Sequence, residues 1–239
     1  MPNQNIVVIG ASGGLGSAFV NFFADNPGNR IHAFARSEIE SQLTNVSVGR
    51  IDFADEASIQ HAAEQSAQEG PLDCVILATG ILHDTNLMPE KSLRDLSVEK
   101  FQRNLLANTI GPALIAKHFL PRLQRKQRSI FAALSARVGS IGDNHLGGWY
   151  AHRASKAALN MVIKTASIEV ARRQPKAIIV GLHPGTVDTN LSQPFQQRVP
   201  SEKLFTPDYS VKKLSSVLDG LSTEDSGKIF AWDGSEIPY

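Results

Sequence analysis

The residues best suited to chemistry in this sequence are Tyr150, His152 and Lys156, in the stretch GGWYAHRASKAALN from 147 to 160. A phenol, an imidazole and an ammonium group can each give or take a proton when their surroundings shift their pKa. His152 and Lys156 are four positions apart and share one helical face, whereas Tyr150 lies about 200° around the helix. We therefore expect His152 and Lys156 to face one site. Tyr150 is expected to pack beside Trp149, unless the helix begins after it.

The elements that must position these residues are short apolar runs alternating with longer amphipathic segments. Strands are predicted at 5–10, 30–36, 46–52, 73–80, 128–135, 176–185 and 228–234, and helices at 14–25, 55–69, 97–124, 149–173 and 208–221. Such near-continuous apolar strands separated by helices are typical of a parallel sheet covered on both faces. The sequence thus predicts one α/β domain over 1–239, a doubly wound Rossmann-like fold with a seven-stranded parallel sheet and helices on both faces.

Two segments interrupt this regularity. Pro112 lies inside the helical region 97–124 and predicts a bend there. Residues 186–206 are polar and contain two prolines, so we expect a mobile loop of the kind that covers a ligand.

The composition of the chain gives no reason to expect a nucleic acid or a membrane as a partner. The net charge of +1 gives no electrostatic reason to expect a nucleic acid or a membrane surface, and no apolar run is long enough to span a bilayer. The single cysteine, Cys74, cannot form an internal disulfide, which fits a reducing, cytoplasmic location. We expect no metal site.

A glycine-rich turn, VVIGASGGLGSAF, joins the first predicted strand to the first predicted helix. Gly10, Gly14 and Gly16 would permit a tight turn, a close backbone approach to a pyrophosphate, and packing of helix on strand. The N–H groups at the start of the helix would then meet the phosphates. A glycine-rich turn without ligand is the alternative interpretation.

The second strand ends at Ala35-Arg36-Ser37, where a site for NAD usually has an acidic residue. Arg36 could instead pair with a 2′-phosphate, which favours NADP(H) over NAD(H). It could also be an exposed arginine at a strand end. Asp52, after the third strand, could accept a hydrogen bond from an adenine amino group or cap the next helix.

Several stretches, in order, resemble the short-chain dehydrogenase/reductase family. They are the G-x-x-x-G-x-G spacing, DCVILATGI, NTIGP, RASKAALN and HPGTVDTNL, and the ending SGKIFAWDGSEIPY is similar to C-factor-like or sniffer-like carbonyl reductases. The resemblance covers essentially the whole chain. It implies hydride transfer between a nicotinamide cofactor and a small carbonyl or alcohol. It also implies cofactor contacts from Gly10, Ser12, Gly14, Leu15, Gly16, Arg36, Asp52, Phe53, Ala78, Gly80, Asn108, Lys156, Pro184, Gly185, Val187 and Thr189.

The sequence departs from the family where the substrate oxygen would be bound. In that family a tyrosine gives the proton, a lysine four residues later lowers its pKa, a serine holds the substrate oxygen, and an asparagine anchors a water that relays protons. Lys156 and Asn108 are present, but His152 stands at the tyrosine position and Ala136 at the serine position.

Substitutes for the two missing groups are His152 and Ser135. His152 could donate a proton, although Lys156 would disfavour its charged form. Ser135, beside Ala136, would need a bulge or the end of the strand to face the same way. The catalytic candidates are therefore Lys156, Asn108, His152 and Ser135.

Several functions remain open. The chain is an NADP-dependent reductase of small, apolar carbonyl compounds, or a dinucleotide-binding regulatory or signalling protein with little or no turnover. A protein deliberately altered by removal of its active-site groups would have the same sequence features as one that diverged naturally. A methyltransferase would have no use for the lysine-bearing helix. By resemblance we expect a homodimer or homotetramer paired through 97–124 and 149–173.

Overall fold

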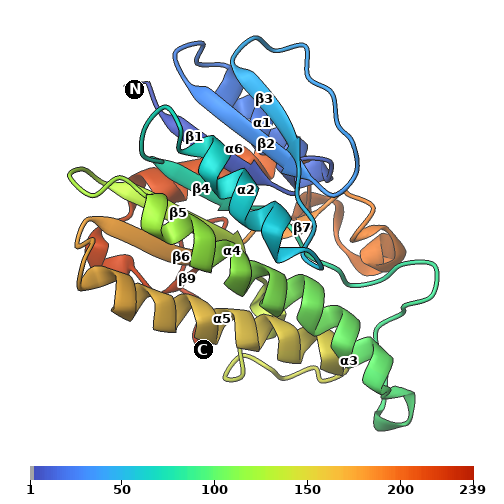
Figure 1. Ribbon diagram of the computed structural model, residues 1–239. Helices are drawn as coiled ribbons and strands as arrows, with labels where there is room; N and C mark the ends of the chain where they lie inside the picture. The colour runs from blue at the N-terminus through green and yellow to red at the C-terminus, as the bar shows by residue number, and fades with distance from the viewer. Residues whose placement is uncertain (1–2) are drawn as a thin grey trace.

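Seven parallel strands form the central sheet of the protein (Figure 1), and the computed structural model describes residues 3–239. Their order across the sheet is β3 (Val46–Arg50), β2 (Arg30–Ala35), β1 (Asn5–Ile9), β4 (Cys74–Leu77), β5 (Ser129–Leu134), β6 (Ala177–His183) and β9 (Ile229–Ala231). The strand order reverses between β1 and β4, which is where ligands bind in open α/β sheets. The predicted seven-stranded doubly wound fold is confirmed, and each predicted strand is present with slightly shorter bounds.

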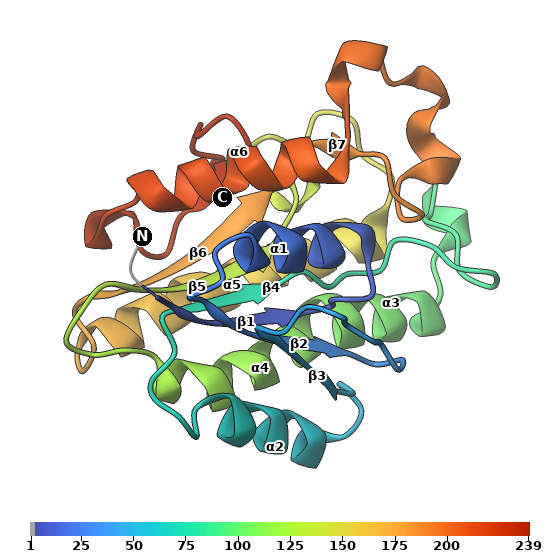
Figure 2. The ribbon, with the colours of Figure 1, turned by 90° about the horizontal axis from the view of Figure 1, so that it is seen from above.

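Helices cover both faces of this sheet (Figure 2). One face carries α1 (Gly14–Ala24) and α6 (Pro207–Gly220), and the other carries α2 (Glu56–Ser66), α4 (Gly111–Phe119) and α5 (Tyr150–Ala171). Within β1, Ile6 and Val8 pack toward α1 and α6, whereas Val7 and Ile9 pack toward the opposite layer. This alternation follows from the two-residue period of a strand. It explains why strands buried on both faces are apolar throughout.

The segment predicted as one bent helix over 97–124 is more finely divided. It consists of α3 (Val98–Leu105), a π-helical turn (Leu106–Ile110), α4 and a short 3₁₀ turn (Leu120–Arg122). Pro112 has no N–H to offer the carbonyl of Asn108, four residues earlier, so the α-helical hydrogen-bond pattern cannot run unbroken across this point. The expected bend is therefore a π turn centred on Asn108, a residue the sequence singled out for chemistry.

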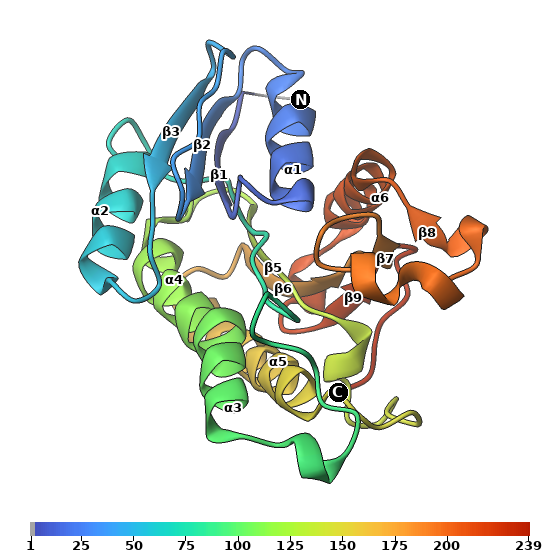
Figure 3. The same ribbon diagram turned by 90° about the vertical axis from the view of Figure 1, so that its right-hand side faces the viewer.

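Residues 186–206 contain regular structure, where an irregular loop was expected. β7 (Thr186–Val187) pairs in parallel with β8 (Leu204–Phe205), and the chain between them forms two 3₁₀ turns. Figure 3 shows this excursion beside α6. Across residues 3–239, no helix combines the length and apolarity that crossing a bilayer requires.

Candidate active site

A cavity of about 590 Å³ opens at the carboxyl ends of β1, β4, β5 and β6. Loops after these four strands and the first turns of α5 form its walls. Twelve of the residues singled out from the sequence line it: Ser12, Gly14, Leu15, Ala78, Gly80, Ser135, His152, Lys156, Pro184, Gly185, Val187 and Thr189. The topology thus brings together residues that are up to 177 positions apart in the chain.

Gly10 and Gly16 are not part of the cavity wall, and they have a packing role beneath it. Gly10 has a φ of +92°, and a Cβ there would lie 2.7 Å from the Ala78 carbonyl oxygen. A Cβ on Gly16 would lie 2.0 Å from the Gly10 carbonyl oxygen. Both glycines therefore allow the loop after β1 to pass close to α1 and to the end of β4.

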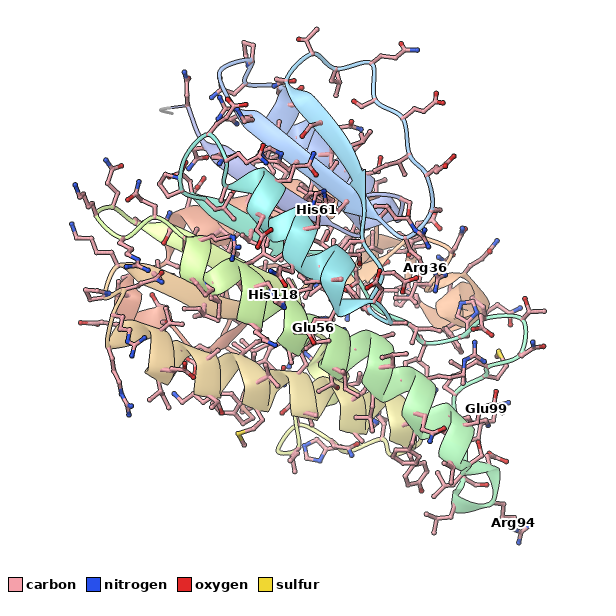
Figure 4. All side chains as sticks on the ribbon, viewed as in Figure 1. Arg36, Glu56, His61, Arg94, Glu99 and His118 are labelled. Atoms are coloured by element: carbon pink, nitrogen blue, oxygen red, sulfur yellow. The ribbon has the colours of Figure 1, made fainter. Side chains whose placement is uncertain are left out.

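Besides Gly10, Gly16 and Asn108, three more predicted cofactor residues lie outside the cavity lining. The exposed Arg36 side chain, at the end of β2 (Figure 4), forms no hydrogen bond or ion pair within residues 3–239. Asp52 accepts the Ala54 N–H at 3.0 Å, while the cap of α2 is Asp55. The ring of Phe53 packs on Gly111 at the start of α4. Their roles toward a cofactor stay predictions.

The residues present fit a phosphate-bearing dinucleotide. No side chain caps the first N–H groups of α1, so they are free to bind an anion. A Cβ on Gly14 would meet Thr189 at 2.8 Å, and one on Gly80 would lie 3.3 Å from both the Lys156 Nζ and the Asn108 Oδ1. Thr79 adds a buried hydroxyl that has no hydrogen-bond partner among residues 3–239. Glycines that leave room for a ligand and a polar atom that lacks a partner therefore occur along the same cavity wall. Among the described residues no group of histidine, cysteine, aspartate or glutamate side chains could hold a metal ion.

Lys156 is almost fully buried, with 5% of its surface exposed. Its Nζ donates a hydrogen bond to the Leu134 carbonyl at the end of β5, at 2.8 Å. Burial lowers the pKa of this ammonium group to about 8, so it remains mostly charged at neutral pH. It is a cation at the cavity wall with hydrogens left to donate.

Asn108 holds the chain after β4 in place. Its Oδ1 accepts the Ile81 N–H at 2.8 Å, and its Nδ2 donates to the Ile81 carbonyl at 2.9 Å and to the Ser155 Oγ at 3.0 Å. One fully buried amide therefore ties α5 to the loop that follows β4.

His152 lies one turn before Lys156 on the same face of α5, as the four-residue spacing predicts. Its Nδ1 is 3.0 Å from the Ile81 carbonyl oxygen, and its side chain is buried. Burial lowers the pKa of the imidazole to about 3, and the positive charge of Lys156 adds to this effect. His152 is thus neutral at physiological pH.

Comparison with known proteins identifies the family. The sequence profile of the short chain dehydrogenase family matches residues 4–200. The C-signal of Myxococcus xanthus is 34% identical over 170 residues, covering 71% of this chain and 94% of the relative. The chain belongs to the short-chain dehydrogenase/reductase family. The similarity to C-signal confirms the expected C-factor-like type.

Two further relatives span this short-chain dehydrogenase/reductase from end to end. The 1-hydroxy-2-glutathionyl-2-methyl-3-butene dehydrogenase of Rhodococcus sp. is 27% identical over 239 residues, covering 99% of this chain and all of the relative. The crystal structure of NADPH-bound carbonyl reductase from chicken fatty liver superposes with a TM-score of 0.84 at 26% identity, covering all of both chains.

The part of the cavity expected to bind substrate offers few free hydroxyl groups. Ala136 presents a methyl group to the cavity, and the neighbouring Ser135 Oγ donates to the Asn160 Oδ1 at 2.6 Å, so its hydrogen is already used. Tyr150 begins α5, and none of the three tyrosines of the described chain lines the cavity. A contact of Ser135 with substrate stays a prediction.

Glu90 is a residue that sequence reasoning missed. Its side chain is 1% exposed, its carbonyl accepts the Trp149 N–H at 2.6 Å, and its carboxylate accepts the Ala151 N–H at 3.2 Å. Gly147, Gly148 and Trp149 all have positive φ, of 63°, 65° and 53°. Glu90 therefore supports the strained start of α5, two residues before His152. A glutamate in a mixed, polar loop carries no sequence signal of burial.

Aromatic rings close the outer end of the cavity. Trp149 and Phe195 lie 5.0 Å apart between ring centroids, and His83 meets Phe195 edge-on at 5.6 Å. Phe205, by contrast, packs on Trp232 at 4.6 Å and is not part of the lining. Leu82 and Phe195 are among the apolar side chains that line the cavity.

Proposed function

We propose that this chain is an NADP(H)-dependent oxidoreductase that interconverts a small, uncharged alcohol and its carbonyl. The observation that carries this proposal is that one cavity joins the start of α1, the buried Lys156 and the imidazole of His152. An anion site, a cation and a proton-exchanging group are the parts that such a reaction needs.

The chain's own residues would divide the work as follows. The bound nicotinamide cofactor supplies or accepts the hydride. The first N–H groups of α1 would hold its phosphates, and Lys156 would donate hydrogen bonds to its hydroxyl groups. Asn108 fixes the backbone at Ile81 against α5. His152 exchanges the proton of the substrate oxygen, and the apolar walls, among them Leu82, exclude water.

The preference for NADP(H) rests on Arg36. An exposed guanidinium without a partner among the described residues is available to a 2′-phosphate, and the two residues directly after β2 are Arg36 and Ser37 rather than a carboxylate that would bind a ribose hydroxyl. The NADPH in the chicken carbonyl reductase, a relative over the whole chain, supports the same choice.

A second candidate is a dinucleotide-binding regulatory protein with little turnover. Two observations favour it: Ala136 offers no hydrogen bond to a substrate oxygen, and the neutral His152 is a poor acid. One relative is named as a signal.

The deciding experiment measures binding and turnover separately. NADPH binding is followed by nicotinamide fluorescence, and turnover by nicotinamide absorbance, with panels of alcohols and carbonyls. We expect NADPH binding, and turnover with an uncharged alcohol–carbonyl pair. Tight binding without turnover, together with turnover in a His152→Tyr, Ala136→Ser double variant, would establish the regulatory alternative. Absence of binding would refute both.

We further propose pairing into a homodimer or homotetramer in the cytoplasm. Leu106 and Ile110 beside α4, and Met161 and Ile168 on α5, are 40–66% exposed apolar side chains on the two expected interface helices. Light scattering of the wild type and of a Met161→Glu variant tests this: a monomeric wild type would refute it.

A further inference from the structure

The hydrogen atoms around His152 can be assigned from the shortest contacts of each neighbouring group. Asn108 Nδ2 has two hydrogens, and its two shortest contacts are to the Ile81 carbonyl at 2.9 Å and the Ser155 Oγ at 3.0 Å, with the Asn104 Oδ1 next at 3.3 Å. The Ser155 hydroxyl donates its own hydrogen to the His152 carbonyl at 2.8 Å, so it can only accept from Asn108. The more distant contact of 3.4 Å between Asn108 Nδ2 and His152 Nδ1 therefore receives no hydrogen.

The imidazole must then be the donor in its own contact. A carbonyl oxygen only accepts, so the 3.0 Å approach of Nδ1 to the Ile81 oxygen requires a hydrogen on Nδ1. In a neutral imidazole the other nitrogen, Nε2, then carries a lone pair. Nε2 has no hydrogen-bond partner among residues 3–239 and belongs to a ring that lines the cavity. The nitrogen available to substrate is an acceptor.

From this network we infer that His152 acts as the proton acceptor in oxidation of an alcohol, which makes alcohols the substrates for which the resting site is built. The inference rests on the proposed oxidoreductase function. The substrate C–H bond breaks and its hydride leaves for the oxidised nicotinamide. The O–H bond breaks and its proton goes to Nε2, while the remaining electron pair forms the C=O bond. The products are a carbonyl compound, the reduced cofactor and an imidazolium.

The surroundings make the imidazolium short-lived. His152 is desolvated, and Lys156 and Arg153 on its own helix both disfavour a second positive charge; burial is the larger cause of its lowered pKa. The imidazolium therefore returns its proton to water readily. A weak base suffices in the forward step, because a hydroxyl becomes strongly acidic as the hydride departs. The charged or titratable groups on the surrounding elements include Glu90, His83, the Asp84–Arg103 pair, Arg137, His183 and Asp188.

With the hydrogen on Nδ1 of His152, alcohol oxidation and carbonyl reduction should depend differently on pH. Oxidation uses neutral His152, whose pKa is about 3, so its kcat/KM should be constant between about pH 5 and 7.5. Reduction needs the imidazolium, so its kcat/KM should fall about tenfold per pH unit over that range. A tyrosine at this position predicts the opposite pH dependences, because a phenol is protonated throughout this pH range. Reduction would be constant and oxidation would rise with pH.

Imidazole ¹⁵N spectra test the inference without turnover. They are recorded on the whole protein with and without NADP⁺ from pH 5 to 8, and the His152 signals are assigned by their loss in His152→Phe. We expect a protonated Nδ1 and a bare Nε2 throughout. The exposed His61 on α2 (Figure 4) gives the matched control, because His61→Gln should leave these signals unchanged. A hydrogen on Nε2, or titration within this range, would overturn the inference.

Kinetics supply the second half of the test, with cyclohexanol, 2-butanol and benzyl alcohol and their carbonyl counterparts. Flat oxidation with falling reduction, and the exchanged pattern in His152→Tyr, support the inference. Reduction independent of pH in the wild type, or oxidation that survives in His152→Phe, overturns it while leaving the oxidoreductase proposal intact. Cofactor binding without turnover in either direction overturns both.

Discussion

The two ends of the cavity differ in how closely they follow the pattern expected from the sequence. At the cofactor end, the turn after β1 and Lys156 form the cavity wall, Asn108 holds the neighbouring loop, and the first N–H groups of α1 are left uncapped. At the substrate end, His152 and Ala136 stand where the resemblance to the family predicted a tyrosine and a serine. On the proposed function, binding a dinucleotide and transferring a proton are separable tasks within one fold.

The largest effect should come from Lys156, where the two ends meet. Lys156→Met keeps the length of the side chain and removes its charge. Losing charged hydrogen bonds of about 1.5–3 kcal/mol each should lower kcat/KM on the order of 100-fold or more. The pKa of His152 should rise, since Lys156 helps to lower it, yet burial keeps it below its usual value. Steady-state kinetics and histidine titration measure the two effects. Unchanged kcat/KM would mean that the cavity is not where turnover occurs.

Restoring the substrate end should give the next largest effect. His152→Tyr with Ala136→Ser adds a protonated phenol and a hydroxyl, and general acid catalysis contributes about 10²-fold or more. We expect carbonyl reduction at pH 7 to rise by about that factor, with little change in NADPH affinity. Ala136→Ser alone is the matched control, because it adds a hydrogen bond without altering the proton donor. A double variant no faster than wild type would show that the substrate end differs in more than these two groups.

A smaller and more selective effect is expected at Arg36. Arg36→Ala should weaken NADPH binding about tenfold through loss of one charge-assisted contact, and NADH binding should stay as it is. Arg50, on the neighbouring strand β3, is a matched control, because Arg50→Ala removes a charge that already has a partner in Asp52. Fluorescence titration with both cofactors measures the ratio. Equal losses for NADPH and NADH would exclude a phosphate-binding role for Arg36.

The smallest effect should come from Glu90, which touches neither end directly. Glu90→Gln retains an oxygen for the Ala151 N–H and should change kcat/KM less than about threefold, whereas Glu90→Ala removes the acceptor and should cost about 1–3 kcal/mol of stability. Thermal unfolding of the two variants measures the difference. Equal unfolding temperatures for Glu90→Ala and wild type would show that the strained start of α5 holds itself in place.

The spacing of apolar residues in the sequence was sufficient to predict the sheet and most of the helices. Runs such as NIVVI are buried on both faces of a parallel sheet, and that environment leaves few alternatives for an apolar run. The glycine turn and the His152–Lys156 spacing likewise point to their cavity because both depend on local geometry. Glu90 and the Asn108–Ile81–His152 network were not predictable, because they join segments 27 to 71 residues apart through single hydrogen bonds. Pro112 signalled a disturbance, but a π turn and a kink have the same sequence signature.

The three positive φ angles before α5 have a consequence for how this helix is set along its axis. Gly147, Gly148 and Trp149 have left-handed backbone conformations, and the right-handed helix starts at the next residue. This change of backbone handedness fixes the boundary of the helix, which cannot extend backward into the loop. Shifting the helix by one residue would force another side chain into the left-handed region, which costs about 1–2 kcal/mol. The junction thereby fixes where α5 begins, and so it fixes the positions of His152 and Lys156 along the helix and their angle around its axis.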